Sequence, residues 1–222
     1  IAWGLSLQGA VSLGDYIYTS NPEFTQMIDN SATDVVHSRV NWKGMKVEST
    51  PQTAINVGLN FRGPNNWFAS VDFNYYDRLY LSMNPMYRTE YLANEIKRIY
   101  DWNNLETGRQ KAYVVGIIDE IRQQEDLGNA YTLSASIGKN FRIKYKYTLG
   151  FSLQVNNILN NQRIRTGGYE QMRLNKLSDP IIFPNADGEM VITKKPTTYS
   201  RFDSKYFYMN GINYYLNIYF RF

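Results

Sequence analysis

Cysteine is absent from this 222-residue chain, and histidine occurs only once. The absence of cysteine excludes disulfide frameworks, thiolate metal sites and cysteine nucleophiles. No stretch approaches the ~18 consecutive apolar residues of a membrane helix, which excludes a helical membrane protein. An excess of one charge is also lacking, because 24 basic and 20 acidic residues leave a net charge of only +4. We therefore expect no nucleic-acid partner.

Catalytic groupings are equally scarce. The only histidine, His37, is followed by Ser38, but neighbouring side chains in a strand point to opposite faces and cannot form a catalytic pair. Neither a metal-ligand spacing nor a phosphate-binding loop occurs. We expect a protein that is not an enzyme and that binds no cofactor or metal.

Tyrosine, by contrast, is abundant, with 19 residues among 15% aromatics. Tyrosine suits boundaries between water and an apolar phase, such as membrane girdles or ligand platforms. The mean hydropathy of −0.46 does not exclude a membrane barrel, because half of every barrel strand faces a polar interior.

The last twelve residues, Gly211 to Phe222, alternate strictly between apolar and polar side chains. One face carries Tyr214, Leu216, Ile218, Phe220 and Phe222, and the other carries asparagine, tyrosine and arginine. This alternation predicts a strand with one apolar and one polar face. A soluble protein seldom leaves an apolar strand uncovered, whereas a strand that faces lipid requires such a face.

The same alternation recurs along the chain and predicts seven strands. They cover residues 3–14, 35–47, 55–62, 67–76, 131–138, 147–156 and 206–222. The composition of Gly63-Pro64-Asn65-Asn66 predicts a tight turn between two of them. Helical spacing appears only between about 81 and 130, where two groups of residues predict two short helices: Leu92, Ile96 and Ile99, then Val114, Ile117, Ile118 and Ile121.

The predicted connections alternate in length. Those at 63–66 and 140–146 are short and share one side of the sheet, and those at about 81–130 and 158–204 are long and share the other. The connection at 19–34 fits least well, because it falls on the short side with an intermediate length. Short periplasmic turns and long extracellular loops are typical of outer-membrane barrels, whose smallest members have eight strands. We therefore expect an all-β chain that is a portion of a transmembrane barrel, completed by strands that precede Ile1.

Several segments, taken in their order and spacing, resemble one family. They are Thr50-Pro51-Gln52-Thr53-Ala54, Asn74-Tyr75-Tyr76-Asp77, Asn84-Pro85, Arg88-Thr89, Gln124-Glu125-Asp126-Leu127, Val155-Asn156-Asn157-Ile158-Leu159-Asn160, Thr166-Gly167-Gly168-Tyr169-Glu170-Gln171 and the ending from Lys205 to Phe222. Over nearly the whole chain, this set is similar to the C-terminal barrel of TonB-dependent outer-membrane receptors. It is most similar to the branch with an N-terminal carboxypeptidase-regulatory-like domain. Glu48-Ser49 departs from the glycine-rich turn that is usual before the Thr-Pro pair.

The resemblance implies that residues 1–222 are the C-terminal part of a 22-stranded barrel, and that the complete barrel encloses a globular plug. Such a receptor imports a scarce extracellular ligand with energy from TonB, which would act through the N-terminal part. The ligand class stays open among oligosaccharide, peptide, siderophore and cobalamin. The expected partners are outer-membrane lipid, the receptor's own plug and earlier strands, and a surface lipoprotein over the loops. The C-terminus would be periplasmic, and its alternating aromatic side chains, from Tyr214 to Phe222, resemble the signal for membrane insertion.

Two groups of residues are candidates for binding. The predicted polar face would contact the plug and trapped water through His37, Arg39, Lys43, Arg62, Asp72, Asn74, Asn156 and Arg221. The loop aromatics are better candidates for ligand contact, because binding surfaces concentrate on loops. They are Tyr87, Tyr91, Trp102, Tyr113, Tyr169 and Phe183. Alternatively, the apolar faces of the two helices pack onto neighbouring loops.

Two other functions remain open. The barrel could be a structural or assembly subunit of an outer-membrane complex, with loops that bind another protein. A soluble β-sandwich that binds sugars through a tyrosine-rich face would show the same alternation. The asymmetry of the connections and the aromatic ending argue against the sandwich.

Overall fold

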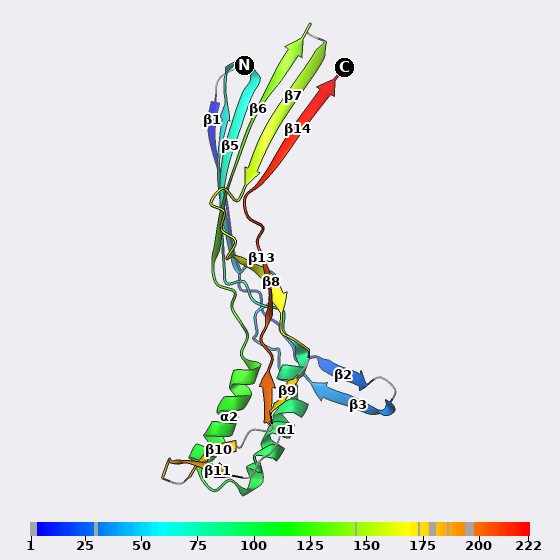
Figure 1. The fold of residues 1–222 in the computed structure, drawn as a ribbon, viewed down its shortest axis with the longest axis vertical. Helices are drawn as coiled ribbons and strands as arrows, with labels where there is room; N and C mark the ends of the chain where they lie inside the picture. The colour runs from blue at the N-terminus through cyan, green and yellow to red at the C-terminus, as the bar shows by residue number, and fades with distance from the viewer. Residues whose placement is uncertain are drawn as a thin grey trace.

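The structure, a computed structural model, describes residues 4–28, 31–144, 146–172, 174–177, 181–185, 187–193 and 198–222. It is mostly β, with one large sheet at one end of an elongated molecule and two helices at the other (Figure 1). Neither helix among the described residues is long and apolar enough to cross a membrane.

The large sheet has six strands in the order β1-β4-β5-β6-β7-β14, and each pairs antiparallel with its neighbours. Their bounds are β1 Gly4–Leu13, β4 Thr53–Arg62, β5 Trp67–Asp77, β6 Ala130–Ile143, β7 Tyr147–Asn156 and β14 Asn213–Arg221. The outer strands, β1 and β14, have a neighbour on one side only within the described residues, so the sheet is open. It is not a closed barrel.

The register of the sheet keeps the two faces separate across all six strands. On one face Leu7 lies opposite Leu59, which lies opposite Val71. Twenty large apolar side chains on this face remain exposed: Leu5, Leu7, Val11, Leu13, Val57, Leu59, Phe61, Trp67, Val71, Phe73, Tyr131, Ile137, Phe141, Ile143, Leu149, Leu153, Tyr214, Leu216, Ile218 and Phe220. The apolar face therefore has no cover among the described residues.

Short and long connections lie at opposite ends of the sheet, without the exception that the sequence predicts at 19–34. The two short turns, at 63–66 and 144–146, lie at one end, where left-handed backbone at Asn65 (φ 53°) and Lys144 (φ 51°) reverses the chain. All three long connections, at 14–52, 78–129 and 157–212, lie at the other end. We call these the short-turn end and the loop end.

The prediction of a sheet strand at 35–47 is wrong, and the sheet has six strands of the seven expected. β3 (Ser31–Arg39) pairs with β2 (Glu23–Ile28) in a hairpin that projects sideways from the loop end (Figure 1). The chain then turns at Gly44, whose φ of 86° favours glycine. The alternation identified a strand only over the first part of this range, since β3 ends at Arg39. It could not identify the partner of that strand, because any two-stranded hairpin has the same period. Because no strand of the large sheet lies at 35–47, β1 and β4 are joined by one long connection at 14–52. The connection of intermediate length expected at 19–34 is part of it.

The second long loop and the predicted last strand also contain more structure than expected. Three small antiparallel pairs form within residues 165–208. They join β8 (Arg165–Tyr169) to β13 (Lys205–Tyr208), β9 (Leu174–Leu177) to β12 (Thr198–Arg201), and β10 (Ile181–Pro184) to β11 (Met190–Thr193). The strand expected at 206–222 is thus divided between β13 and β14.

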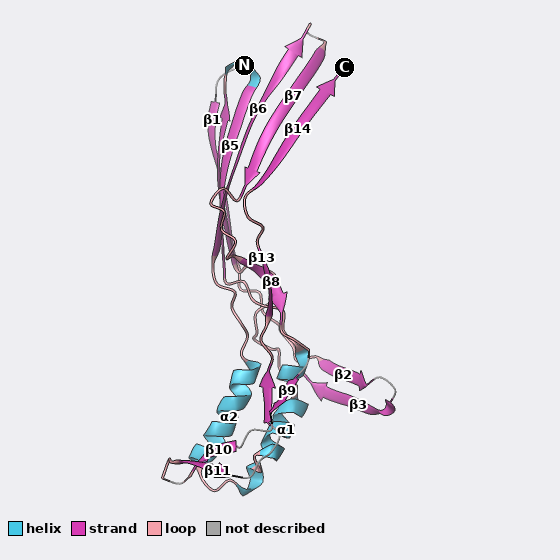
Figure 2. Ribbon diagram, viewed as in Figure 1, coloured by secondary structure: helices cyan, strands magenta, loops and turns pink. Residues whose placement is uncertain are grey.

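The two predicted helices are confirmed as α1 (Glu90–Ile99) and α2 (Gly108–Arg122), which lie together at the loop end (Figure 2). Thr89 caps α1 by accepting a hydrogen bond from the Leu92 amide at 3.1 Å, and Thr107 with Gln110 forms a capping box on α2. A short 3-10 turn, η2 (Pro85–Arg88), precedes α1, and another, η3 (Trp102–Asn104), separates the helices. The apolar faces meet in one buried cluster of Tyr87, Leu92, Ala93, Ile96, Val114, Ile118 and Ile121.

Candidate functional site

The polar face of the sheet has the composition expected of a wall in contact with water. Cross-strand pairs hydrogen-bond along it, with Asn56 donating to Asn74 at 2.9 Å and the hydroxyls of Ser70 and Ser136 2.8 Å apart. Glycines on this face make room for large neighbours, since a Cβ on Gly150 would meet the ring of Tyr219 closer than 3 Å. The hydroxyl of Tyr219 crosses this space to donate to Asn140 at 2.7 Å.

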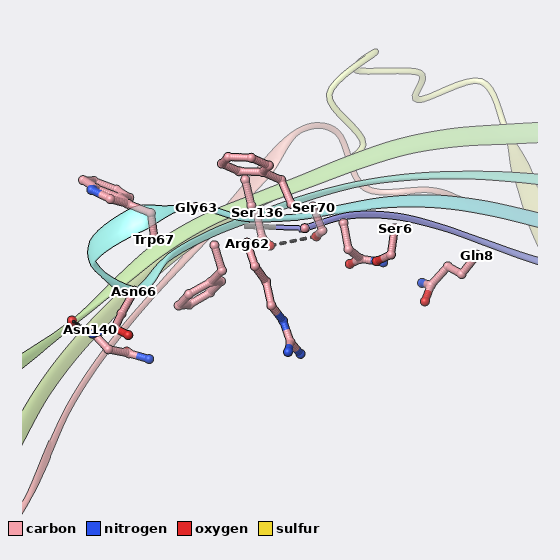
Figure 3. A pocket seen from close by; sticks show the side chains of 14 residues that line it. Ser6, Gln8, Arg62, Gly63, Asn66, Trp67, Ser70, Ser136 and Asn140 are labelled. Carbon is pink, nitrogen blue, oxygen red and sulfur yellow. Dashed lines mark hydrogen bonds between the residues drawn. The ribbon is translucent and has the colours of Figure 1, made fainter. Parts of the chain in front are cut away.

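Five of the eight predicted polar-face residues lie on this face by register: Arg62, Asp72, Asn74, Asn156 and Arg221. At the short-turn end the face is hollowed, with a volume of about 1020 Å³. Arg62 and Gln8 extend to one side of the sheet there, and Trp67 extends to the other (Figure 3). The only charged group in its lining is the guanidinium group of Arg62, and the rest of the lining mixes amide and hydroxyl groups with aromatic rings.

The other three predicted polar-face residues, His37, Arg39 and Lys43, do not lie on the sheet. They belong to the first long loop, because β3 is the second strand of the side hairpin and residues 40–47 follow it in a turn. Lys43 is exposed in that turn, where its amide donates to Asn21 at 2.8 Å. Their assignment to the polar face of the sheet is therefore wrong.

His37 and Arg39 instead line a hollow of about 670 Å³ between the β2–β3 hairpin and α1, which we call the hairpin hollow. Tyr91 of α1 lines it from the opposite side and is 43% exposed. The hydroxyl of Ser38 accepts a hydrogen bond from the Tyr91 amide at 2.9 Å, which ties the hairpin to the helix. The hollow thus combines one guanidinium group, one imidazole, one phenol and two carboxylates, those of Glu23 and Glu90.

The remaining loop aromatics differ in their exposure. Tyr87 is 1% exposed in the helix cluster, and burial raises the pKa of its phenol. Tyr113 packs against the same cluster, as the alternative reading of the sequence allowed. Trp102 is partly buried, with the ammonium groups of Lys97 and Lys111 at 5.1 and 5.9 Å from its ring. Tyr169 is exposed beside Phe207, and the side chain of Phe183 lies outside the described residues.

A buried ion-pair network, which the sequence did not single out as a site, joins the long loops. Arg88 is 0% exposed, and its Nη2 donates to the Glu170 carboxylate at 2.8 Å. Arg201 donates to the same carboxylate at 2.8 Å, and the Asn84 amide does so at 2.8 Å. Asn41, from the first long loop, donates through its amide to the carbonyl oxygen of Arg88 at 2.9 Å. We call Arg88, Glu170 and Arg201 the loop clamp.

Two further contacts connect the same three loops. The side-chain amide of Gln124 pairs with the backbone of Lys46 in both directions, at 2.9 and 2.6 Å. Glu125 accepts hydrogen bonds from Ser204 at 2.8 Å and from Tyr206, and the latter bond raises the pKa of the Tyr206 phenol. Several segments that carried the family resemblance therefore meet in space, although they lie far apart in the chain.

Metal-binding groupings are absent from the part of the chain that the structure describes: no three acidic or histidine side chains lie close enough to hold an ion. Comparisons with protein-family models, with curated proteins and with solved structures found no match to this chain.

Proposed function

We propose that this chain is the C-terminal part of the barrel of a TonB-dependent outer-membrane receptor. It would supply late barrel strands and loops that cover a scarce extracellular ligand. The observation that carries the proposal is the uncovered apolar face. Leu7 and Ile218, at opposite sides of the sheet, are 75% and 66% exposed.

Covering that face would add a large burial energy. Fully burying one exposed large apolar side chain contributes about 1.5–3 kcal/mol. The twenty side chains are between 36% and 75% exposed, so covering them would contribute on the order of 20 kcal/mol, which is comparable with the whole stability of a folded domain, about 5–15 kcal/mol. A cover is therefore strongly favoured, and lipid is the cover that a single-layer sheet with one polar face accepts.

The distribution of aromatic side chains favours a bilayer over a second protein layer. On the apolar face, Tyr75, Tyr131 and Tyr214 lie toward the loop end, and Trp67, Phe141 and Phe220 lie toward the short-turn end. From Tyr131 to Phe141 the strand spans roughly 33 Å, which a tilt of ~40° reduces to roughly 25 Å. That is the height of the apolar band in outer-membrane barrels.

The same arrangement argues against the soluble β-sandwich. A sandwich covers the apolar face of one sheet with a second sheet. Among the described residues, the other strands form only two-stranded sheets, which lie at or toward the loop end. Six strands are also fewer than the eight of the smallest outer-membrane barrel, so the proposal requires strands beyond those described.

The proposal predicts that the full-length receptor needs detergent to remain in solution and migrates faster on a gel before boiling than after it. A folded outer-membrane barrel resists the gel detergent until it is heated, because its strands are joined in one hydrogen-bonded ring. A monomer that stays freely soluble in buffer would contradict the proposal. Loss of nutrient uptake in a strain without TonB would separate the receptor from the structural alternative.

We propose the hairpin hollow as a site of ligand contact at the loop end, because it combines the exposed ring of Tyr91 with the guanidinium group of Arg39. Tyr91→Ala should weaken uptake about tenfold at limiting ligand, because exposed aromatic anchors contribute strongly to binding. Arg39→Ala should act in the same direction. The nutrient would first be identified from growth of a deletion strain on single nutrient sources. Tyr208→Ala is the matched control, since this tyrosine is 54% exposed outside the hollow. If Tyr91→Ala and Tyr208→Ala weaken uptake equally, the hairpin hollow does not bind the ligand.

A further inference from the structure

The charges of the large sheet are strongly asymmetric. Its six strands and two short turns contain six cations and two anions among the described residues. The cations are Arg62, Lys139, Arg142, Lys144, Lys146 and Arg221. All six lie toward the short-turn end, whereas Asp72 lies in mid-sheet and Asp77 at the loop end. Among the described residues, the short-turn end therefore carries no acidic side chain to balance these six cations.

One of these cations lies on the apolar face. By register, Lys139 is opposite Trp67 on one side and Phe151 on the other, so its side chain shares the face of those rings. Its ammonium group lies 4.8 Å from the ring centre of Trp67 and 4.9 Å from that of Phe141. Phe151 packs beside both rings, and its ring centre lies 6.0 Å from that of Trp67 and 6.0 Å from that of Phe141. We call these four residues the boundary cluster.

The ammonium group of Lys139 has no ion-pair partner among the described residues. A lysine on a lipid-facing surface is costly at the bilayer midplane and nearly neutral at the interface, where its head group can reach polar atoms. The surrounding aromatic rings are the side chains that favour the same level. The cluster therefore places Lys139 at the boundary between hydrocarbon and lipid head groups.

Two more lysines extend this positive surface. Lys144 and Lys146 are exposed in the adjacent β6–β7 turn, and the Lys146 ammonium lies 5.3 Å from the ring centre of Tyr147. By contrast, Arg62, Arg142 and Arg221 lie on the polar face. Three ammonium groups thus lie at the short-turn end of the sheet, and the described strands and turns around them carry no acidic side chain there.

From this arrangement we infer that the boundary cluster, with Lys144 and Lys146, binds the phosphate of an anionic glycerophospholipid. The aromatic rings would pack along the upper part of the acyl chains, and the ammonium groups would contact the phosphate oxygens. A lipid fits better than free phosphate, because the rings around Lys139 need an apolar partner. The inference rests on the proposed membrane location and adds a specific lipid to it.

Native mass spectrometry of the full-length receptor in non-ionic detergent, titrated with phosphatidylglycerol, tests the site. Lys139→Ala should retain about fivefold less lipid, the effect of one charge at a membrane surface. Lys139→Arg keeps the charge and should bind as the parent protein does. Lys43→Ala removes an exposed lysine of the first long loop, outside the sheet, and should leave retention unchanged. The Lys144→Ala, Lys146→Ala double variant changes only exposed turn residues, so it tests the site even if Lys139→Ala fails to fold.

Unchanged phosphatidylglycerol retention in both alanine variants would overturn the lipid site. An equal loss of zwitterionic phosphatidylcholine would overturn the preference for an anionic head group, and equally tight binding of soluble glycerol phosphate would overturn the choice of lipid. Insertion of the parent protein into vesicles is measured in parallel. If the parent inserts but the lysines have no effect, only this inference fails. If the parent never enters a bilayer, the proposed function fails.

Discussion

Arginine in place of Leu153 should reduce the equilibrium constant for folding of the full-length receptor into lipid vesicles by about 30-fold or more. Leu153 lies in the middle of β7 on the apolar face and is 36% exposed. An arginine on the lipid side of a barrel costs about 2–4 kcal/mol at the bilayer midplane. Each 1.4 kcal/mol changes an equilibrium constant about tenfold. The folded fraction can be measured from the fast-migrating band on unboiled gels across a urea series.

Two controls make this result specific for lipid. Gln154→Arg changes the adjacent residue, which is exposed on the polar face, and should alter stability by no more than about 0.5 kcal/mol. Ile143→Arg lies on the apolar face at the short-turn end and should cost only about 0–1 kcal/mol, because arginine there reaches the interface. A protein layer over the sheet would give no such dependence on depth. Equal costs at positions 143 and 153 would therefore argue against a bilayer.

Alanine in place of Glu170 should destabilise the loop end by about 3–5 kcal/mol while the sheet stays folded. The substitution leaves the guanidinium group of Arg88 buried without its counter-charge, and that is the costly way to break a buried ion pair. Arg201, whose side chain is 21% exposed, can turn toward water. Hydrogen exchange of the α1 and α2 amides in the detergent-solubilised receptor measures the loss of protection.

A second variant distinguishes the ion pair from simple packing. Replacing Arg88 and Glu170 together by methionine removes both charges and should recover most of the protection, because an apolar pair avoids the desolvation cost. Glu95→Ala breaks the exposed pair with Arg98 and should cost no more than about 1 kcal/mol. Exchange rates that are the same in Glu170→Ala and Glu95→Ala would show that the clamp does not hold the loops together.

Local sequence determined the regular elements well, because their periods are a direct record of local geometry. Period-two alternation located all six strands of the sheet and assigned their apolar and polar faces. Helical spacing located α1 and α2 within a long connection. The helical spacing left open whether the apolar faces of the two helices would be buried. In the structure these faces pack against each other.

Partners in space were not determined in the same way. The segment at 35–47 has a good strand period, yet β3 pairs with β2 outside the sheet, because the period of a strand says nothing about its neighbour. That one difference moved His37 and Arg39 from the predicted polar face to a hollow beside Tyr91. The loop clamp was beyond local reasoning for a similar reason, since Arg88 and Glu170 lie 82 residues apart.

The sequence by itself determined that this chain builds strands with one face for an apolar phase and one for water, and that its connections are of two lengths. Each property belongs to a single segment and can be read from side-chain order. Only the tertiary structure decided that the sheet has six strands, that a third long connection at 14–52 joins the two predicted ones at the same end, and that Lys139 lies among aromatic rings. These depend on which segments pair, and pairing is fixed by hydrogen bonds between residues distant in the chain.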